Sequence, residues 1–430
     1  MITKRTAKVA GACLALSLAA AACGGSGDTG GGGGGGSDSN GVEVFSWWTS
    51  GSESEALQVL IDKYDTETGG EVSNAAVSGG GGANARQALA TRLQGGDPPD
   101  SWQLHPDQDL FAAVADGSVA DITSTFEDNG WVDVIPQDVL DMLAVDGKYY
   151  AVPVNAHRGN VLWTSPSVLE ENGITWDDST TPDQFMADAK TLSDAGVTPV
   201  CLGDKDVFAA SQLLETLIMG RVGGDGWNSL FSGDLSFDDA DVKSAVEDYV
   251  DLVDMANEDH SALTWDQAAV MVGEGDCAAN LMGDWAYGEL LNKGFVENED
   301  FGYVTMPGTS EVFDYVGDAF VKPAENAPNA EGEDAWLSLL LDPTVQADFN
   351  LKKGSTPIRT DVPLDDFPPY QKGAANDFRS KQIVSSLAHF QVAPAEFAQA
   401  YADAVTALNG DGNVDSFLES MTAAQSSLLG

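Results

Sequence analysis

Residues 43–53 read Glu43-Val44-Phe45-Ser46-Trp47-Trp48-Thr49-Ser50-Gly51-Ser52-Glu53. A short apolar strand ends in two consecutive tryptophans, and a Ser/Gly turn then leads into a helix. Ser52 and Glu55 form a capping box, and an apolar stripe at helical spacing predicts that this helix covers residues 52–66. Two indole rings at the end of a strand, close to backbone N–H groups and the Glu53 carboxylate, are suited to binding a polar ring that has an apolar face.

Strands and helices continue to alternate in the next part of the chain. The expected order is strand, helix and strand, at residues 71–78, 84–94 and 101–105. This order is typical of a parallel sheet, in which ligands lie at the carboxyl ends of the strands. Because side chains alternate along a strand, Gln103 and His105 share one face near such an end. They therefore join the tryptophan pair as candidate site residues.

Composition and charge limit the classes of protein to which the chain can belong. The 430 residues, 43% of them hydrophobic, are enough for two domains with separate cores. The formal net charge of −48 argues against nucleic acid or an anionic membrane surface as a direct partner. Since no single acidic tract dominates, we interpret the acidity as a source of solubility outside the cell.

The N-terminal residues predict export. Three basic residues precede an apolar run that ends in Leu18-Ala19-Ala20-Ala21-Ala22-Cys23-Gly24 and is shorter than the ~20 residues of a membrane-spanning helix. The segment resembles a bacterial lipoprotein signal, in which residues 1–22 are removed and Cys23 carries the lipid; ordinary cleavage after the small residues is the alternative. Residues 23–41 are mostly Gly, Ser and Asp, which predicts a flexible tether. We therefore expect a globule anchored by lipid to the outer face of the cell membrane.

Two cysteines remain in the globular part, Cys201 and Cys277. Exported proteins meet an oxidising compartment, so these two are predicted to form a disulfide. Neither has a second Cys or a His at ligand spacing, and no metal site is expected. The run Gly79–Gly82 has no Gly-Lys-Ser/Thr after it, so we interpret it as a surface loop near the cleft and not as a phosphate-binding loop. No cofactor is expected.

Later segments predict a second lobe and several crossings between the lobes. Residues 148–155 form an extended run that we interpret as the first crossing. Residues 316–321 are expected to form one strand of the first lobe. The last helices are expected at residues 374–389, 393–408 and 413–428. The predicted fold class is α/β with two lobes and a hinge, in which residues 42–156 and 312–358 form lobe 1 and residues 157–311 and 359–430 form lobe 2.

Five motifs occur in order along the chain. They are Phe45-Ser46-Trp47-Trp48-Thr49-Ser50-Gly51, Gly95-Gly96-Asp97-Pro98-Pro99-Asp100 followed by Trp102-Gln103-Leu104-His105, Asp276-Cys277-Ala278-Ala279-Asn280-Leu281-Met282-Gly283-Asp284-Trp285, Lys353-Gly354-Ser355-Thr356-Pro357-Ile358-Arg359 and Ala388-His389. In this order, and after a lipoprotein signal, they resemble the bacterial extracellular solute-binding proteins of the sugar-binding, maltose-binding-protein-like class. The resemblance covers residues 42–430 and is closest to the glucose-binding proteins of ABC importers.

The resemblance implies a type II periplasmic-binding-protein (venus-flytrap) fold that closes on one sugar. It implies that these side chains lie at the ligand: Trp47, Trp48, Glu53, His105, Trp285, Asp318, Lys353 and His389. Gln103, on the face of His105, is a further candidate, and Asp284 is either a ligand contact or the cap of the helix that it opens. Because neighbouring residues of a strand point to opposite faces, at least one of Trp47 and Trp48 is expected in the core or at the rim.

These expectations define a function and its alternatives. We expect the chain to capture a sugar, glucose or a similar monosaccharide, outside the cell and to deliver it as a lipid-anchored monomer to a membrane ABC permease, without catalysis. Binding of an oligosaccharide or of another polar solute is one alternative. A secreted carbohydrate-active enzyme is another; it would need two carboxyl groups about 5–9 Å apart, for which Glu53, Asp284 and Asp318 are candidates by residue type.

Overall fold

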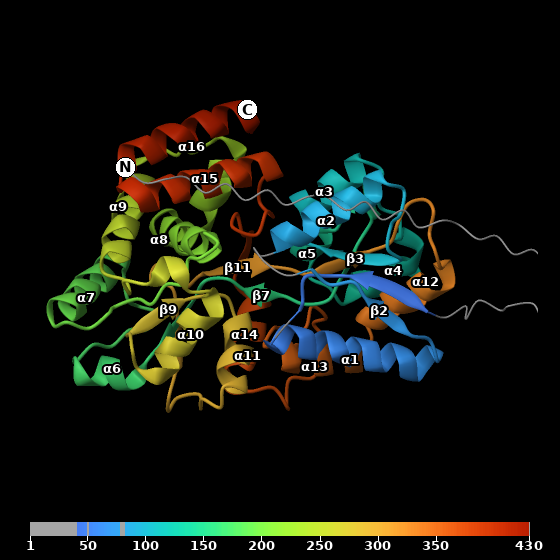
Figure 1. Cartoon of the computed structure of the whole chain (residues 1–430), viewed down its shortest axis with the longest axis horizontal. Helices are drawn as coiled ribbons and strands as arrows, with labels where there is room; N and C mark the ends of the chain where they lie inside the picture. The colour runs from blue at the N-terminus through green and yellow to red at the C-terminus, as the bar shows by residue number, and fades with distance from the viewer. Residues whose placement is uncertain (1–40, 50, 78–81, 430) are drawn as a thin grey trace, which may run out of the picture. The chain divides into compact units, whose positions relative to one another are not determined.

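The computed structural model describes residues 41–49, 51–77 and 82–429. Residues 38–430 belong to one unit, and the features below lie in its described part (Figure 1). The predicted lipoprotein signal with Cys23, and the tether up to residue 40, lie outside the described residues. Within the described part, no helix combines the length and the apolar character that crossing a membrane requires.

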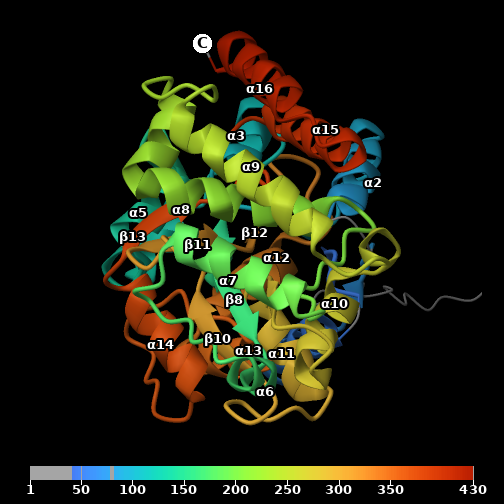
Figure 2. The same cartoon turned by 90° about the vertical axis from the view of Figure 1, so that its left-hand side faces the viewer.

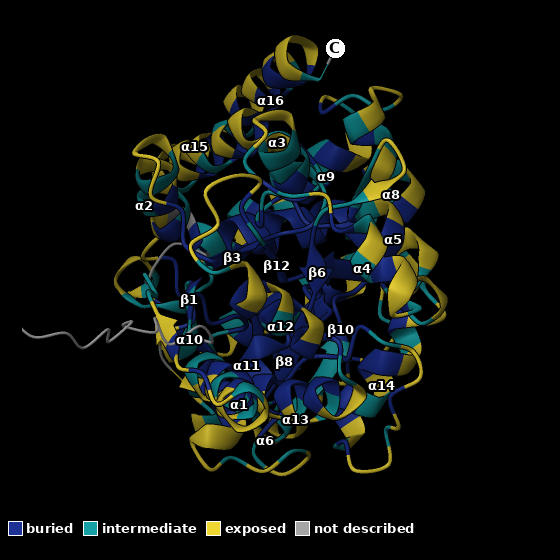
Figure 3. Cartoon of the chain, turned by 90° about the vertical axis from the view of Figure 1, so that its right-hand side faces the viewer, coloured by how far each residue is buried: buried dark blue, intermediate teal, exposed yellow. Residues whose placement is uncertain are grey.

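A five-stranded sheet carries the tryptophan pair just beyond one of its strands. Its members are β1 (Val42–Phe45), β2 (Val72–Asn74), β3 (Ser101–Leu104), β6 (Val152–Pro153) and β12 (Ala319–Val321), in the order β2-β1-β3-β12-β6. β1 runs parallel to β2 and β3, as the alternation of strands and helices predicts. β12 is antiparallel to both β3 and β6. Figure 3 shows β3, β12 and β6 as buried strands.

Helices from both the early and the late part of the chain surround this sheet. They are α1 (Gly51–Thr68), α2 (Ala83–Gln94), α3 (Gln108–Ala115), α4 (Thr123–Asp128), α5 (Gln137–Met142), α12 (Ala330–Leu340) and α13 (Pro343–Lys353), with a short 3-10 turn at Trp131–Asp133 and a hairpin of β4 (Ala144–Val145) and β5 (Lys148–Tyr149). α1 packs against α12 and α13. Its apolar stripe, Leu57, Leu60 and Tyr64, is buried there, which is why the helical period could be read from the sequence.

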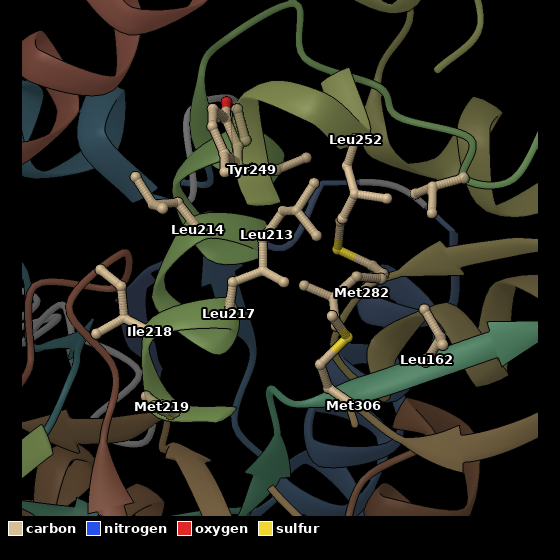
Figure 4. Packing of buried hydrophobic residues seen from close by; sticks show 14 of the residues in the cluster. Leu162, Leu213, Leu214, Leu217, Ile218, Met219, Tyr249, Leu252, Met282 and Met306 are labelled. Carbon is tan, nitrogen blue, oxygen red and sulfur yellow. The ribbon is translucent and has the colours of Figure 1, made fainter. Parts of the chain in front are cut away.

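A three-stranded antiparallel sheet lies at the centre of the helix-rich part. β8 (Val161–Thr164) pairs with β9 (Ala279–Leu281) and β10 (Gly302–Thr305). The helices of this part are α6 (Pro166–Glu171), α7 (Pro182–Asp194), α8 (Phe208–Ser232), α9 (Ala240–Asp254), α10 (Trp265–Glu274), α11 (Trp285–Asn292), α15 (Ala395–Asp411) and α16 (Val414–Leu428), with a 3-10 turn at His260–Ala262. Figure 2 shows α7 beside β8, with α8 and α9 higher in the view. In Figure 4, Leu213 and Leu217 of α8 point toward Leu162 of β8 and toward Met282 and Met306.

A disulfide joins Cys201 and Cys277, as predicted. Both cysteines are fully buried, and their Cα atoms are 5.9 Å apart. The bond ties the segment before α8 to the segment that leads into β9, where the Cys201 N–H also donates to the Ala279 carbonyl.

A third sheet contains the strand that lies between two hydrophobic cores. β11 (Val312–Val316) is parallel to β13 (Gln382–Ser385) and antiparallel to β7 (His157–Arg158). The buried apolar residues form a first core, from residues 42–156 and 313–358 with Phe378, and a second core, from residues 161–306 and 370–424 with Val312 and Val316. Along β11 the side chains alternate between the two cores, since Phe313 and Tyr315 belong to the first and Val312 and Val316 to the second.

The structure differs from the predicted elements in three places. Residues 374–389 are not one helix: α14 spans Pro369–Phe378, and β13 follows. The single strand expected at 316–321 is split at Gly317 and Asp318 into the end of β11 and β12. The helices α3, α4 and α5 were not predicted, because they are short and their apolar residues do not repeat over several turns.

Candidate functional site

A cavity of about 480 Å³ opens between residues of the first core and residues of the second core. One wall comes from the turn after β1, the N-terminus of α1, the residue after β3, and the end of α13. The opposite wall comes from the N-termini of α8, α10 and α11 and from the loop after β13. The cavity has the size expected of a small-molecule site, since such pockets are about 300–1,000 Å³.

The cavity brings together seven of the ten residues predicted to contact a ligand. They are Trp47, Glu53, His105, Trp285, Asp318, Lys353 and His389. The other three, Trp48, Gln103 and Asp284, do not lie on the cavity wall; all three are buried behind it.

The two tryptophans follow the end of β1 at Phe45, and their side chains have different surroundings. Trp47 is half-buried on the cavity wall, and its ring centroid lies 5.0 Å from that of His105. Trp48 is fully buried and packs against Phe320 and Phe349, with ring centroids 5.7 and 5.5 Å away. The expectation that both indoles line the site is therefore corrected: one is a wall and the other is part of the first core.

Gln103 and Asp284 hold wall residues in position instead of lining the cavity. Gln103 donates from Nε2 to Asp318 at 2.7 Å and accepts from the Trp47 N–H at 3.2 Å. Asp284 is hydrogen-bonded to Nδ1 of His157 and accepts from the Arg158 N–H at 3.1 Å. Although Asp284 stands at the start of α11, its side chain does not cap that helix. Burial raises the pKa of Asp284 well above its usual value.

Asp318 is a buried carboxylate with fixed partners. Its Oδ1 accepts from Gln103, and its Oδ2 accepts from Asn155 at 2.9 Å. The Asp318 N–H donates to Asn155 in return, also at 2.9 Å. Burial raises its pKa, and the positive charge of Lys353 works in the opposite direction. The break between β11 and β12 gives this side chain its place on the wall.

The charges on the wall are mostly acidic, and its two lysines are already paired. The wall carries five carboxylates, Glu53, Asp206, Asp266, Glu289 and Asp318, and two lysines, Lys293 and Lys353. Lys353 lies 2.7 Å from Glu53, and Lys293 lies 3.2 Å from Glu289. The ammonium of Lys353 is also 5.1 Å from the ring centroid of Trp48, a cation–π distance.

Three histidines line the same cavity. His105 Nδ1 is 2.8 Å from the Gly317 carbonyl oxygen, and His389 Nδ1 is 2.8 Å from Ser386 Oγ. Burial, with a contribution from the charge of Arg86, lowers the pKa of His105 to about 4. Burial also lowers the pKa of His157 and of His389 well below the usual value. The cavity therefore contains neutral imidazole rings at neutral pH.

The second wall contains aromatic residues that the sequence did not reveal. Phe208 lies at the start of α8 with its ring centroid 6.1 Å from that of Trp285, and Trp265 lies at the start of α10. The polar residues Glu289 and Lys293 were also missed. They follow Trp285 at steps of four, so the helical period starting from Trp285 would have placed them on the same face.

Glycines allow the two walls to approach each other closely. A Cβ atom on Gly288 of α11 would lie 2.8 Å from the Ser52 Cβ of α1 and 3.3 Å from the Lys353 carbonyl oxygen. A Cβ atom on Gly51, which has φ +59°, would lie 3.0 Å from a carboxylate oxygen of Glu289. Of the run Gly79–Gly82 only Gly82 is described, and it lies on the wall beside the ring of Trp47.

In the described part of the chain no group of His, Cys, Asp and Glu side chains has an arrangement that could hold a metal ion. The cavity wall offers apolar ring faces, neutral imidazoles, carboxylates and two paired ammonium groups.

Sequence comparison places the chain beside known proteins. Residues 49–347 match the family described as bacterial extracellular solute-binding protein. An uncharacterised ABC transporter extracellular-binding protein of Pyrococcus horikoshii is 34% identical over 85% of this chain and 83% of its own length. A probable sugar-binding periplasmic protein of Brucella melitensis is 31% identical over 86% of this chain and 88% of its own length.

Solved structures share the fold at low sequence identity. A chitin oligosaccharide binding protein superposes with a TM-score of 0.79 at 18% identity, over 91% of this chain and 99% of its own. The solute-binding protein RafE in complex with raffinose superposes with a TM-score of 0.68 at 18% identity, over 90% of this chain and 99% of its own. The predicted fold class, an α/β protein with two lobes, is confirmed.

Proposed function

The chain belongs to the bacterial extracellular solute-binding protein family, and on that premise we propose that it captures a sugar in the cavity between its two cores. The observation that carries the proposal is the pairing of apolar ring faces with buried polar groups on opposite walls. Trp47 stands on one wall, and Trp285 with Phe208 stands on the other. A sugar ring needs both kinds of contact, since its C–H faces are apolar and each buried hydroxyl needs a hydrogen-bond partner.

The polar contacts would come from residues whose positions are already fixed. Asp318 is held by Gln103 and Asn155, and Lys353 is held by Glu53. Preorganised side chains lose little conformational entropy when a ligand binds, which favours tight binding of a small polar solute. We assign the ligand contacts to Trp47, Glu53, His105, Trp285, Asp318, Lys353 and His389, and we propose glucose or a similar monosaccharide as the ligand.

We further propose two lobes, residues 42–156 with 312–358 and residues 157–311 with 359–430; the two cores support this division, although Val312 and Val316 pack in the second core and Phe378 in the first. Because β11 contributes side chains to both cores, we place the hinge at the sheet of β7, β11 and β13. Ligand binding would shift this hinge toward a closed form. A closed monomer anchored through Cys23 would then deliver the sugar to a membrane ABC permease. Relatives with sugar-binding names support this role.

A thermal-shift panel of sugars tests the proposal. A sugar present at about 100 times its dissociation constant is expected to stabilise the fold by about 2.7 kcal/mol. The panel contains glucose, galactose, xylose, maltose and raffinose, so that ring number and epimer are both varied. The sugar proposal is wrong if no member raises the melting temperature. Release of monosaccharide from maltose would instead support an enzyme, and this is measured on the same samples.

A further inference from the structure

Two cavity histidines have partners that fix where their protons lie. His105 follows β3 and His389 follows β13, and their ring centroids are 5.9 Å apart with the rings nearly perpendicular. A neutral imidazole carries its hydrogen on one nitrogen and a lone pair on the other. The partner of Nδ1 therefore decides whether Nε2 is a donor or an acceptor.

For His105 the partner of Nδ1 is a backbone carbonyl. The Gly317 oxygen, 2.8 Å from Nδ1, can only accept, so Nδ1 must carry the hydrogen. Burial and the nearby charge of Arg86 keep the ring neutral. Nε2 then bears a lone pair, and it is buried with no hydrogen-bond partner among the described residues. A buried acceptor without a partner, on the wall of a cavity, points to a ligand.

For His389 the partner of Nδ1 is a hydroxyl whose single hydrogen is already used. Ser386 Oγ donates to the Glu215 carboxylate at 2.7 Å, so it can only accept from His389 Nδ1. Glu215 also accepts from the N–H groups of Leu387 and Ala388, at 2.7 and 2.8 Å. Burial raises the pKa of Glu215 to about 7, and the hydrogen bonds from Ala388, Ser386 and Leu387 favour its ionised form. The ionised carboxylate holds the loop and takes the hydroxyl hydrogen of Ser386, so Nε2 of His389 is again the acceptor.

We propose that His105 and His389 act as a pair of hydrogen-bond acceptors. The ligand must therefore donate two hydrogen bonds, one to Nε2 of each ring. This inference rests on the proposed function and narrows it. The ligand class is a neutral sugar with two free hydroxyl groups at the positions facing these rings. Sugars that carry a carboxylate or a phosphate there are excluded.

The charges on the cavity wall also favour a neutral sugar. Each of the two wall lysines is paired with a glutamate, at 2.7 Å for Lys353 and 3.2 Å for Lys293. Among the described wall residues no cation is therefore left over for an anionic substituent, and three further carboxylates would repel it. Arg86, whose charge adds to the effect of burial in lowering the pKa of His105, is not among the residues that line the cavity; its guanidinium carbon lies 6.0 Å from the ring centroid of Trp47.

Nitrogen NMR of the imidazole rings tests the proton positions without any ligand. The chain has four histidines, and His→Asn variants assign the signals one by one. At pH 7 we expect His105 and His389 to show a protonated Nδ1 and an unprotonated Nε2. An Nε2–H signal for either ring would overturn the proposal.

Sugar analogues and one variant test the donor requirement. For the sugar that stabilises most in the panel, each hydroxyl is replaced in turn by hydrogen and by fluorine, which cannot donate. At two positions we expect both replacements to weaken binding to a similar extent, about tenfold to hundredfold. Recovery of affinity by fluorine at every position would contradict the proposal.

His105→Asn keeps an N–H group for the Gly317 carbonyl and removes Nε2. We expect it to lose affinity by a similar factor and to become indifferent to one of the two hydroxyls. His260→Asn is the matched control, because His260 is not on the cavity wall, and its affinity should stay unchanged. If no sugar binds, the proposed function fails while the NMR result still decides the proton positions. If sugars bind but Nε2–H is seen, only the donor requirement fails.

Discussion

At the scale of single residues, the neighbours Trp47 and Trp48, which follow the end of β1, have different roles because their side chains have different surroundings. Trp47 lines the cavity, whereas Trp48 is enclosed by Phe320, Phe349 and the ammonium of Lys353. Of these two adjacent tryptophans, Trp47 is thus expected to contribute to binding and Trp48 to the stability of the first core.

Substituting each tryptophan by alanine should show this separation. Trp47→Ala is expected to weaken sugar binding about tenfold to hundredfold with a small change in the free energy of unfolding. Trp48→Ala is expected to lower that free energy by about 3–5 kcal/mol, because it leaves a cavity in the first core. Titration by calorimetry and urea denaturation measure the two effects. Equal losses of stability in both variants would contradict the assignment.

The contribution of His105 to ligand affinity should not depend on pH over the range in which an ordinary histidine titrates. Its pKa of about 4 lies below the usual 6.5, and the charged groups around it are Arg86, Asp109, Lys353 and Asp318. A ligand that donates to Nε2 needs the neutral ring, so affinity is full above the folded pKa and is lost as the pH falls through about 4. We expect the ratio of the dissociation constants of His105→Asn and of the wild-type chain to be nearly equal at pH 7.5 and pH 5.5, because this ratio reports on His105 and not on Glu215, whose pKa is about 7. A steep change of this ratio centred near pH 6.5 in calorimetric titrations would argue against a neutral, buried ring.

The lowered pKa of His105 also makes the free energy of unfolding depend on pH. Between pH 6.5 and about 4 the unfolded chain binds a proton at His105 and the folded chain does not, so this residue lowers stability as the pH falls. The difference in pKa corresponds to about 3 kcal/mol. His105→Asn should remove this part of the pH dependence in denaturation curves recorded at pH 7 and pH 4.5.

At the scale of elements, α11 packs closely on α1 and α13 because Gly288 has no side chain. An added Cβ would lie 2.8 Å from the Ser52 Cβ and 3.3 Å from the Lys353 carbonyl, too close without a shift of α11. α11 also carries Trp285, so a shift of the helix moves one wall of the cavity.

Gly288→Ala should therefore lower both stability and affinity. We expect a loss of about 1–3 kcal/mol in the free energy of unfolding, as for overpacked sites, together with weaker sugar binding. Gly373→Ala is the control: this glycine is exposed in α14, and its added Cβ would meet no atom within 4 Å. The control should be neutral or slightly stabilising. Thermal melts and titrations of both variants are compared, and unchanged affinity in Gly288→Ala would separate α11 from the site.

Much of this arrangement could be read from the sequence where the pattern is local. The apolar stripe of α1, the alternation from β1 to β3 and seven wall residues follow from local patterns in the sequence. The predicted capping box begins at Ser52, whereas α1 begins at Gly51, so Ser52 lies inside the helix and is not its cap. β13 was missed because it exists only through its pairing with β11, some 70 residues away in the chain, which no local period reports. Phe208 and Trp265 were also missed, because each begins a helix and only the packing of the second core brings it to the cavity.

At the scale of the whole molecule, the two cores share β11, whereas the disulfide lies within only one of them. Cys201 and Cys277 both belong to the second core, and neither lies on the cavity wall. The bond closes a loop between residues 76 positions apart. In the chain-entropy view, a loop of this length stabilises the folded state by about 4 kcal/mol, because it limits the unfolded chain.

Removing the disulfide should therefore change stability without changing the site. For the double variant Cys201→Ser with Cys277→Ser we expect the free energy of unfolding to fall by about 2–5 kcal/mol. Affinity for the sugar should stay the same while the protein is folded, because the bond does not support any residue of the cavity wall directly. Urea denaturation of the oxidised wild-type chain and of the variant gives the first quantity, and titration below the melting temperature gives the second. Reduction of the wild-type chain should reproduce the variant, so a reduced chain as stable as the oxidised one would show that the second core does not depend on this bond.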